Sequence, residues 1–143
     1  MIALFGQVDA IPWVALGNST GNRMHAMSEN ERFERGVAHF NASEFFEAHE
    51  VWEDLWLKAA EPEKTFLQGI IQIAAAFHHY QRGNSRGAKS LLAAGVAKLE
   101  QFPPSNRGVD LARFRDEASV WVESLARGPE TRSRRLPKLH RCR

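Results

Sequence analysis

Apolar residues recur at helical spacing in several stretches of the chain, and the central stretch carries almost no charge. Residues 66–80 read FLQGIIQIAAAFHHY, so apolar side chains would cover most of a helix formed there. The one polar stripe of this helix consists of Gln68, Gln72 and His79. A helix that is apolar around most of its circumference is buried, and this one is too short to span a membrane. We therefore expect a central helix over residues 63–82 that other helices enclose, and no membrane segment.

Start and stop signals bound four further helices. Ser28 followed by Glu31 fits a capping box, in which a hydroxyl and a carboxylate bind the free amides at a helix start. Glu44 opens a second amphipathic stretch, and Gly83-Asn84 is a stop signal after the central helix. The pattern predicts an all-α, five-helix domain. The helices expected on either side of the central one cover residues 29–40, 45–60, 85–101 and 110–126.

The first two helices and the next two echo one another. The triplet His-Phe-Asn at 39–41 is matched forty residues later by His-Tyr-Gln at 79–81, and Ala48 is matched by Ala88. Each half then reads as a helix, a short polar turn and a second helix, which is the plan of tetratricopeptide-like hairpins. We therefore expect two tetratricopeptide-like helical hairpins and a closing C-terminal helix.

Charge is divided unevenly along the chain. The formal net charge is +2, from 19 Lys or Arg and 17 Asp or Glu. Residues 127–143 hold seven Lys or Arg and one Glu, a balance of +6, which leaves −4 for residues 1–126. The basic segment has few apolar residues and no aromatic residue on which a base could stack. We expect residues 127–143 to be a disordered tail whose only nucleic-acid contacts are nonspecific.

The remaining features concern the N-terminus and the cellular compartment. Residues 1–27 show no sustained period, and we expect an irregular or mobile leader, with Met24 and Met27 as alternative starts of a domain at 28–126. No Lys or Arg precedes the apolar part of the leader, so a signal peptide is not expected. Cys142 is the only cysteine, which excludes an intrachain disulfide and is typical of a cytoplasmic protein.

Chemically active side chains gather on the second helix. His49 and Glu53 are four residues apart and therefore neighbours on a helix, with Glu50 a step further round. If this helix packs on the central one, these groups can meet its polar stripe. The sequence thus predicts one polar cluster inside the core, formed by His49, Glu50, Glu53, Gln68, Gln72 and His79.

Three interpretations of this cluster remain open. It can be a hydrogen-bonded pair that locks helix packing, a pocket for a ligand or partner, or a metal or acid–base site. The string HEVWE departs from the zinc motif H-E-x-x-H because Glu53 replaces the second histidine. A metal would need His78 or His79 as a further ligand, so the sequence permits a metal without indicating one, and it specifies no cofactor. The chain also lacks a phosphate loop and a G-x-S-x-G motif.

Two segments carry a family resemblance. They are FNASEFFEAHEVWEDLW at residues 40–56 and FLQGIIQIAAAFHHYQRGNSRGAKSLL at residues 66–92. Their pattern of F-N, F-F-E-A-H-E, x-x-E and W, then F-L-Q-G-x-I-Q, H, G-N and G-A resembles the family called domain of unknown function 309, over about residues 29–100. The resemblance implies a multihelical fold without an established activity. It draws attention to His49, Glu50, Glu53, Gln68 and Gln72.

We therefore expect a helical module that binds a protein partner or a small ligand through the polar cluster. The alternative is a metal-dependent or acid–base, hydrolase-like enzyme, with His49 and Glu53 as ligands or proton carriers and Glu50 as base.

Overall fold

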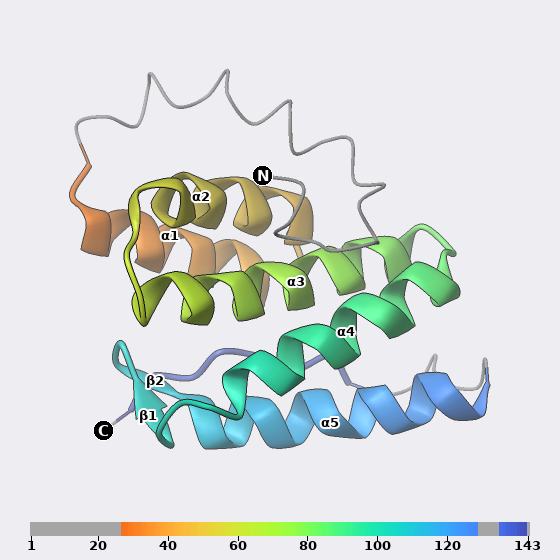
Figure 1. Cartoon of the computed structure of the whole chain (residues 1–143). Coiled ribbons are helices and arrows are strands. Elements are labelled where there is room, and N and C mark those ends of the chain that lie inside the picture. The colour runs from red at the N-terminus through yellow and green to blue at the C-terminus, as the bar shows by residue number, and fades with distance from the viewer. Residues whose placement is uncertain (1–26, 129–134, 143) are drawn as a thin grey trace.

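The structure, a computed structural model, describes residues 27–128 and 135–142 of the chain and has an all-α fold (Figure 1). The leader predicted at residues 1–27 lies outside the described residues except for Met27. All five predicted helices are present, and their ends differ from the predicted ones by at most two residues. They are α1 (Glu29–Asn41), α2 (Phe45–Lys58), α3 (Glu63–Gln81), α4 (Ser85–Leu99) and α5 (Leu111–Arg127).

The central position of α3 is confirmed. Helices α1 and α2 lie on one side of α3, while α4 and α5 lie on the other (Figure 1). Every residue from Phe66 to Phe77 is buried except Gln68. Aromatic rings from several helices pack around it, and Phe40 contacts Phe45, Trp52, Phe77 and Phe114. Among the described residues no helix is both long enough and apolar enough to cross a membrane.

The start of α1 confirms the capping box predicted from the sequence. The Glu31 amide donates to the Ser28 hydroxyl, and the Ser28 amide donates to the Glu31 carboxylate, each at 3.0 Å. Two amides that the helix itself cannot satisfy are thus hydrogen-bonded, and α1 begins where the sequence predicts.

The repeat in the sequence corresponds to one turn built twice. In the α1–α2 turn the Glu44 amide donates to the His39 carbonyl at 2.8 Å, and in the α3–α4 turn the Asn84 amide donates to the His79 carbonyl at 2.9 Å. In both turns the histidine Nδ1 also lies within hydrogen-bond distance of the side chain five residues ahead, at 2.8 Å from Glu44 and 3.2 Å from Asn84. The two halves of the chain therefore share a turn as well as a sequence pattern.

This shared turn predicts the effect of a substitution. Gly83 has a φ of +84°, and Ser43 occupies the equivalent position with a φ of +65°. A residue with a Cβ is strained in this left-handed region, whereas glycine is not. We expect Ser43→Gly to raise the free energy of unfolding by about 1 kcal/mol, measured by urea denaturation. A lower stability would contradict the equivalence of the two turns, and Ser90→Gly within α4 is the control in which glycine should destabilise a helix.

A short hairpin that the sequence did not predict joins α4 to α5. Strands β1 (Ser105–Asn106) and β2 (Val109–Asp110) pair in antiparallel fashion through a turn at residues 107–108. Both turn residues have positive φ angles, +53° at Arg107 and +77° at Gly108, as a two-residue hairpin turn requires. Arginine is uncommon at the first of these positions, so the sequence signal for a turn was weak.

The end of the chain differs from the predicted disordered tail. Residues 135–142 form an extended segment that runs beside α5 to the hairpin (Figure 1). Leu139 is only 3% exposed, and Arg141 forms a β-bridge with Val109. The prediction of disorder was wrong for these residues, because side chains far away in the sequence bind their backbone. Residues 129–134 lie outside the described residues.

Candidate functional site

The predicted polar cluster is centred on one turn of α2. This helix buries the face that contains Phe45, Ala48 and Trp52, and His49 and Glu53 lie beside that face. His49 is 0% exposed and Glu53 is 4% exposed. Their side chains are neighbours, but the 3.8 Å between His49 Nε2 and Glu53 Oε1 is too long for a hydrogen bond. The two side chains are therefore buried side by side without a direct hydrogen bond between them.

Burial keeps the imidazole of His49 neutral. The pKa of His49 is lowered to about 3, mainly by burial and also by the neighbouring His78, while a hydrogen bond with the Phe46 backbone opposes the change. The Phe46 ring contacts both imidazoles, with centroids 5.9 Å from His49 and 5.6 Å from His78. Burial also lowers the pKa of His78. Two uncharged imidazoles therefore flank one phenyl ring at neutral pH.

Burial has the opposite effect on the nearby carboxyl groups, because it disfavours their charged forms. The pKa of Glu53 is raised to about 7, mainly by burial and also by the charges of Asp54 and Glu50. The pKa of Glu50 is raised by burial and by Glu47 and Asp54. Within residues 27–128 and 135–142, the buried Glu53 Oε2 has no hydrogen-bond partner. The site thus combines a neutral imidazole with a carboxyl group that is about half protonated at pH 7.

The antiparallel register of α2 and α3 decides which residues of the central helix are near this turn. His78 lies beside Phe46 at one end of the pair, and Lys64 donates to the Trp56 carbonyl at the other end, at 2.7 Å. At 1.5 Å per residue, Gln72 lies at the height of the turn that carries His49 and Glu53. The Gln72 side chain is buried there, with 3% of its surface exposed.

The other predicted members are placed less centrally. Glu50 and Gln68 are partly exposed, and Gln68 lies one turn beyond Gln72. His79 lies at the α3–α4 turn, where its Nδ1 is 3.2 Å from Asn84 Nδ2, and burial followed by the charge of Arg82 lowers its pKa. The histidine that acts on His49 is therefore His78. The sequence indicated that the His78 side chain points toward the core, because His78 lies on the same helical face as Ile71 and Ala74.

Two further observations concern charge at this site. The carboxylate of Asp54 is 3.8 Å from the guanidinium of the buried Arg32, so Asp54 pairs with α1. Within the described parts of the chain, no three His, Cys, Asp or Glu side chains are grouped so that they could hold a metal ion.

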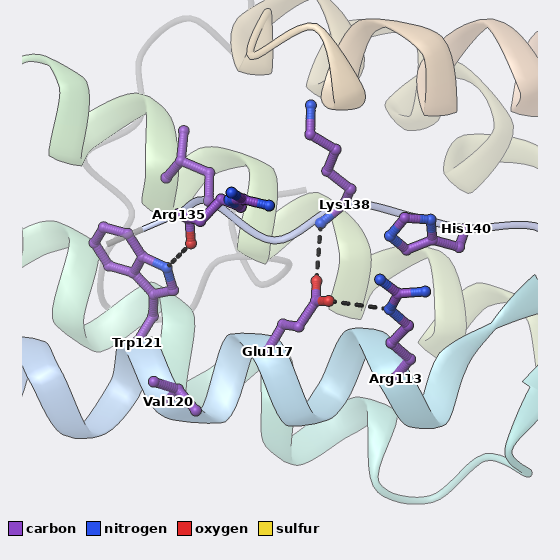
Figure 2. Close-up of a pocket in the computed structure, with 8 residues that line it drawn as sticks. Arg113, Glu117, Val120, Trp121, Arg135, Lys138 and His140 are labelled. Atoms are coloured by element: carbon purple, nitrogen blue, oxygen red, sulfur yellow. Dashed lines mark hydrogen bonds and ion pairs between the residues drawn. The ribbon is translucent and has the colours of Figure 1, made fainter. Parts of the chain in front are cut away.

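A second candidate site lies between α5 and the C-terminal segment, and the sequence did not indicate it. A cavity of about 470 Å³ lies there, lined on the helix side by Arg113, Glu117, Val120 and Trp121 (Figure 2). The segment contributes the other wall, which consists of Arg135, Leu136, Lys138 and His140. Both carboxylate oxygens of Glu117 are bound, one by the Lys138 amide at 3.1 Å and one by Arg113 Nε at 3.2 Å. No regular pattern in the sequence indicates that these two walls lie next to each other.

The fold and the first site define an all-α domain whose second helix carries a buried pair, a neutral imidazole and a carboxyl group with a raised pKa. Residues 33–91 match the family described as "Domain of unknown function (DUF309)", which confirms the resemblance predicted from the sequence. The match includes His49, Glu53 and Gln72 and ends before α5.

The chain is similar to two proteins whose names give no function. An uncharacterised protein of Aquifex aeolicus is 27% identical over 94 residues, which are 64% of this chain and 28% of that protein. The uncharacterised protein YpuF of Bacillus subtilis is 35% identical over 66 residues, which are 45% of this chain and 38% of that protein. The chain thus spans less than two fifths of the length of either relative. Neither name indicates a ligand or a reaction.

Proposed function

We propose that this chain is a helical binding module, which takes an uncharged hydrogen-bonding group of a small ligand or a partner against the polar cluster of α2 and α3. The observation that carries the proposal is the buried Glu53 Oε2, for which the described residues provide no hydrogen-bond donor. A buried oxygen without a donor destabilises a fold, and such costs are concentrated at functional sites. A bound donor would remove this cost.

The charge state of the site supports this class of ligand. His49 is neutral at pH 7 and Glu53 is about half protonated, so the pair offers little attraction to an ion. A neutral imidazole, a carboxyl group and the Gln72 amide are suited to groups that both donate and accept hydrogen bonds, such as amides and alcohols. The tetratricopeptide-like plan predicted from the sequence belongs to the same proposal, since such hairpins commonly bind peptides.

A stability measurement separates a binding site from a pair that only locks the packing. We expect Glu53→Leu to raise the free energy of unfolding at pH 8 by about 1 kcal/mol, because it removes a buried carboxylate and leaves no charge on His49 to be compensated. The matched control is Glu47→Leu, at an exposed position of the same helix, which should change stability little. A loss of about 1–3 kcal/mol in Glu53→Leu would indicate that the pair stabilises the fold and would contradict the proposal.

Binding itself can be tested with a set of small primary amides, ureas and alcohols. We expect compounds that bind to shift the NMR signals of the Gln72 side-chain amide and the His49 ring. The same shifts should persist in Glu47→Leu and disappear in Glu53→Leu. Compounds that shift these signals equally in both variants would place binding elsewhere.

The acid–base alternative rests on a different observation. A pKa of about 7 for Glu53 is near the value at which a general acid or base works best at neutral pH. His49 and Glu50 would then assist a hydrolase-like reaction. Hydrolysis of p-nitrophenyl acetate that follows a pKa near 7 and is lost in Glu53→Gln would favour this second function.

A further inference from the structure

The C-terminal segment is held mainly through its backbone, by side chains from distant parts of the chain. Asn41 binds Leu139 twice, since its Oδ1 accepts from the Leu139 amide at 2.8 Å and its Nδ2 donates to the Leu139 carbonyl at 3.0 Å. Glu117 accepts from the Lys138 amide at 3.1 Å, and Trp121 Nε1 donates to the Arg135 carbonyl at 2.9 Å. These contacts recognise an extended backbone and depend little on the side chains that it carries.

Strand pairing continues the same mode of binding at the other end of the segment. The Asp110 amide donates to the His140 carbonyl at 2.8 Å, and the Cys142 amide donates to the Gly108 carbonyl at 2.9 Å. The segment therefore adds an extended strand to the edge of the β1–β2 hairpin. Addition of a strand to a sheet edge is a common way in which domains bind peptides.

Three apolar side chains and one ion pair determine which sequence fits. Pro137 and Leu139 are buried, while Leu136 is partly buried, so the anchors follow the pattern Leu-Pro-x-Leu. Beyond them, the Arg141 guanidinium is 2.9 Å from the Glu34 carboxylate. The groove thus pairs one acidic side chain, Glu34, with a basic segment that has apolar anchors.

The segment does not fill the groove that holds it. The cavity in Figure 2 lies between the segment and α5, and its volume of about 470 Å³ is within the range of small-molecule sites. Its helix wall includes Val120, which is 42% exposed and is one of two large apolar side chains so exposed among the described residues. This space leaves room for a ligand that fills the groove more completely than the segment does.

We propose that this groove, formed by Asn41, Glu117, Trp121 and β2, is a docking site for an extended, basic segment of a partner protein with a Leu-Pro-x-Leu pattern. The chain's own residues 135–142 are an exchangeable occupant that covers the groove until the partner displaces them. Because the occupant is tethered, its effective concentration is high, and a partner must bind strongly or fill the cavity to compete. This surface is separate from the polar cluster of α2 and α3 and does not depend on it.

The test uses the full chain and a fluorescently labelled peptide with the sequence of residues 135–142, RLPKLHRC. We expect Leu139→Asp to expel the chain's own segment and to bind the peptide at least about tenfold more tightly than the wild type. Adding Asn41→Ala to this variant should weaken binding about tenfold or more, since two backbone hydrogen bonds are lost. Gln81→Ala is the matched control, because Gln81 takes the place of Asn41 in the second hairpin and should leave binding unchanged.

If Leu139→Asp does not fold, amide hydrogen exchange in the wild type tests the same proposal. Peptide at millimolar concentration should accelerate exchange of the Leu139 and Lys138 amides, which become free when the segment is displaced. Unchanged exchange, or equal peptide binding by the wild type and a folded Leu139→Asp variant, would overturn the proposal. A 1:1 complex between the Leu139→Asp and Asn41→Ala chains, each monomeric alone, would show that a second copy of this chain occupies the groove. That result would overturn the proposal that the occupant comes from another protein.

Discussion

Gly36→Ala is expected to lower the free energy of unfolding by about 3 kcal/mol, although alanine is the better helix former. A Cβ at Gly36 would lie 2.1 Å from Nε1 of Trp52, and the nearby Cε2 and Cδ1 atoms of the same ring are at 2.5 and 2.6 Å. Trp52 is fully buried, and its Nε1 donates to the Phe33 carbonyl at 3.2 Å. The indole cannot move away without losing that hydrogen bond and disturbing the aromatic core. Urea denaturation of both proteins measures the difference.

A double-mutant cycle provides the control for this steric argument. Trp52→Leu removes the indole ring that a Cβ at position 36 would contact. In that background Gly36→Ala should cost far less, and could gain up to about 1 kcal/mol from helix propensity. Equal losses in the two backgrounds would show that position 36 is sensitive for a reason other than contact with the indole.

The pair of His49 and Glu53 is expected to give opposite pH dependences of stability when either member is removed. In Glu53→Gln the free energy of unfolding should rise between pH 4.5 and 6.5 relative to the wild type, and in His49→Gln it should fall. For a fully buried group, the difference in free energy of unfolding between variant and wild type changes by up to about 1.4 kcal/mol per pH unit. Over the window from pH 4.5 to 6.5 this amounts to about 3 kcal/mol. Groups common to all three proteins cancel in the comparison.

The signs follow from the direction of each pKa change. Glu53 has a folded-state pKa of about 7 against 4.5 in the unfolded chain, so its contribution is full below pH 4.5 and is lost as pH rises to about 7. His49 has a folded-state pKa of about 3 against 6.5, so its contribution is full above pH 6.5 and is lost as pH falls toward 3. Between pH 4.5 and 6.5 folding moves a proton from the imidazole to the carboxyl group, with no net uptake. The two contributions cancel in the wild type.

Urea denaturation at pH 4.5, 5.5 and 6.5 tests this prediction. If the three proteins show parallel profiles, the two groups titrate in the folded state as they do in the unfolded chain. Such a result would place His49 and Glu53 in contact with water and remove the physical basis of the proposed binding site.

Local patterns in the sequence were sufficient to predict the helices. The capping box at Ser28 and the stop at Gly83 act within a few residues, so they can be recognised without the rest of the fold. The burial of α3 followed from its own apolar circumference. Within the site, the sequence predicted that His49 and Glu53 are neighbours, because side chains four positions apart lie next to each other on a helix.

Features that depend on two elements could not be predicted in this way. One residue rotates the direction of a helical side chain by about 100°, so the choice between His78 and His79 depends on how α2 and α3 are aligned. The fit of Trp52 against Gly36 likewise joins two helices. Residues 135–142 have no helical or alternating period, and their order comes from side chains such as Asn41 and Glu117, which nothing in the segment itself reveals.

The double hydrogen bond between Asn41 and Leu139 also has a consequence for synthesis of the protein. The two residues are 98 positions apart, whereas each helix packs on the one that follows it in the chain. A ribosome that releases the chain from its N-terminus therefore lets the hairpins assemble before Leu139 has been made. Until translation reaches that residue, the end of α1 is open to water and to chaperones, and a nascent chain presents a surface that the finished molecule covers.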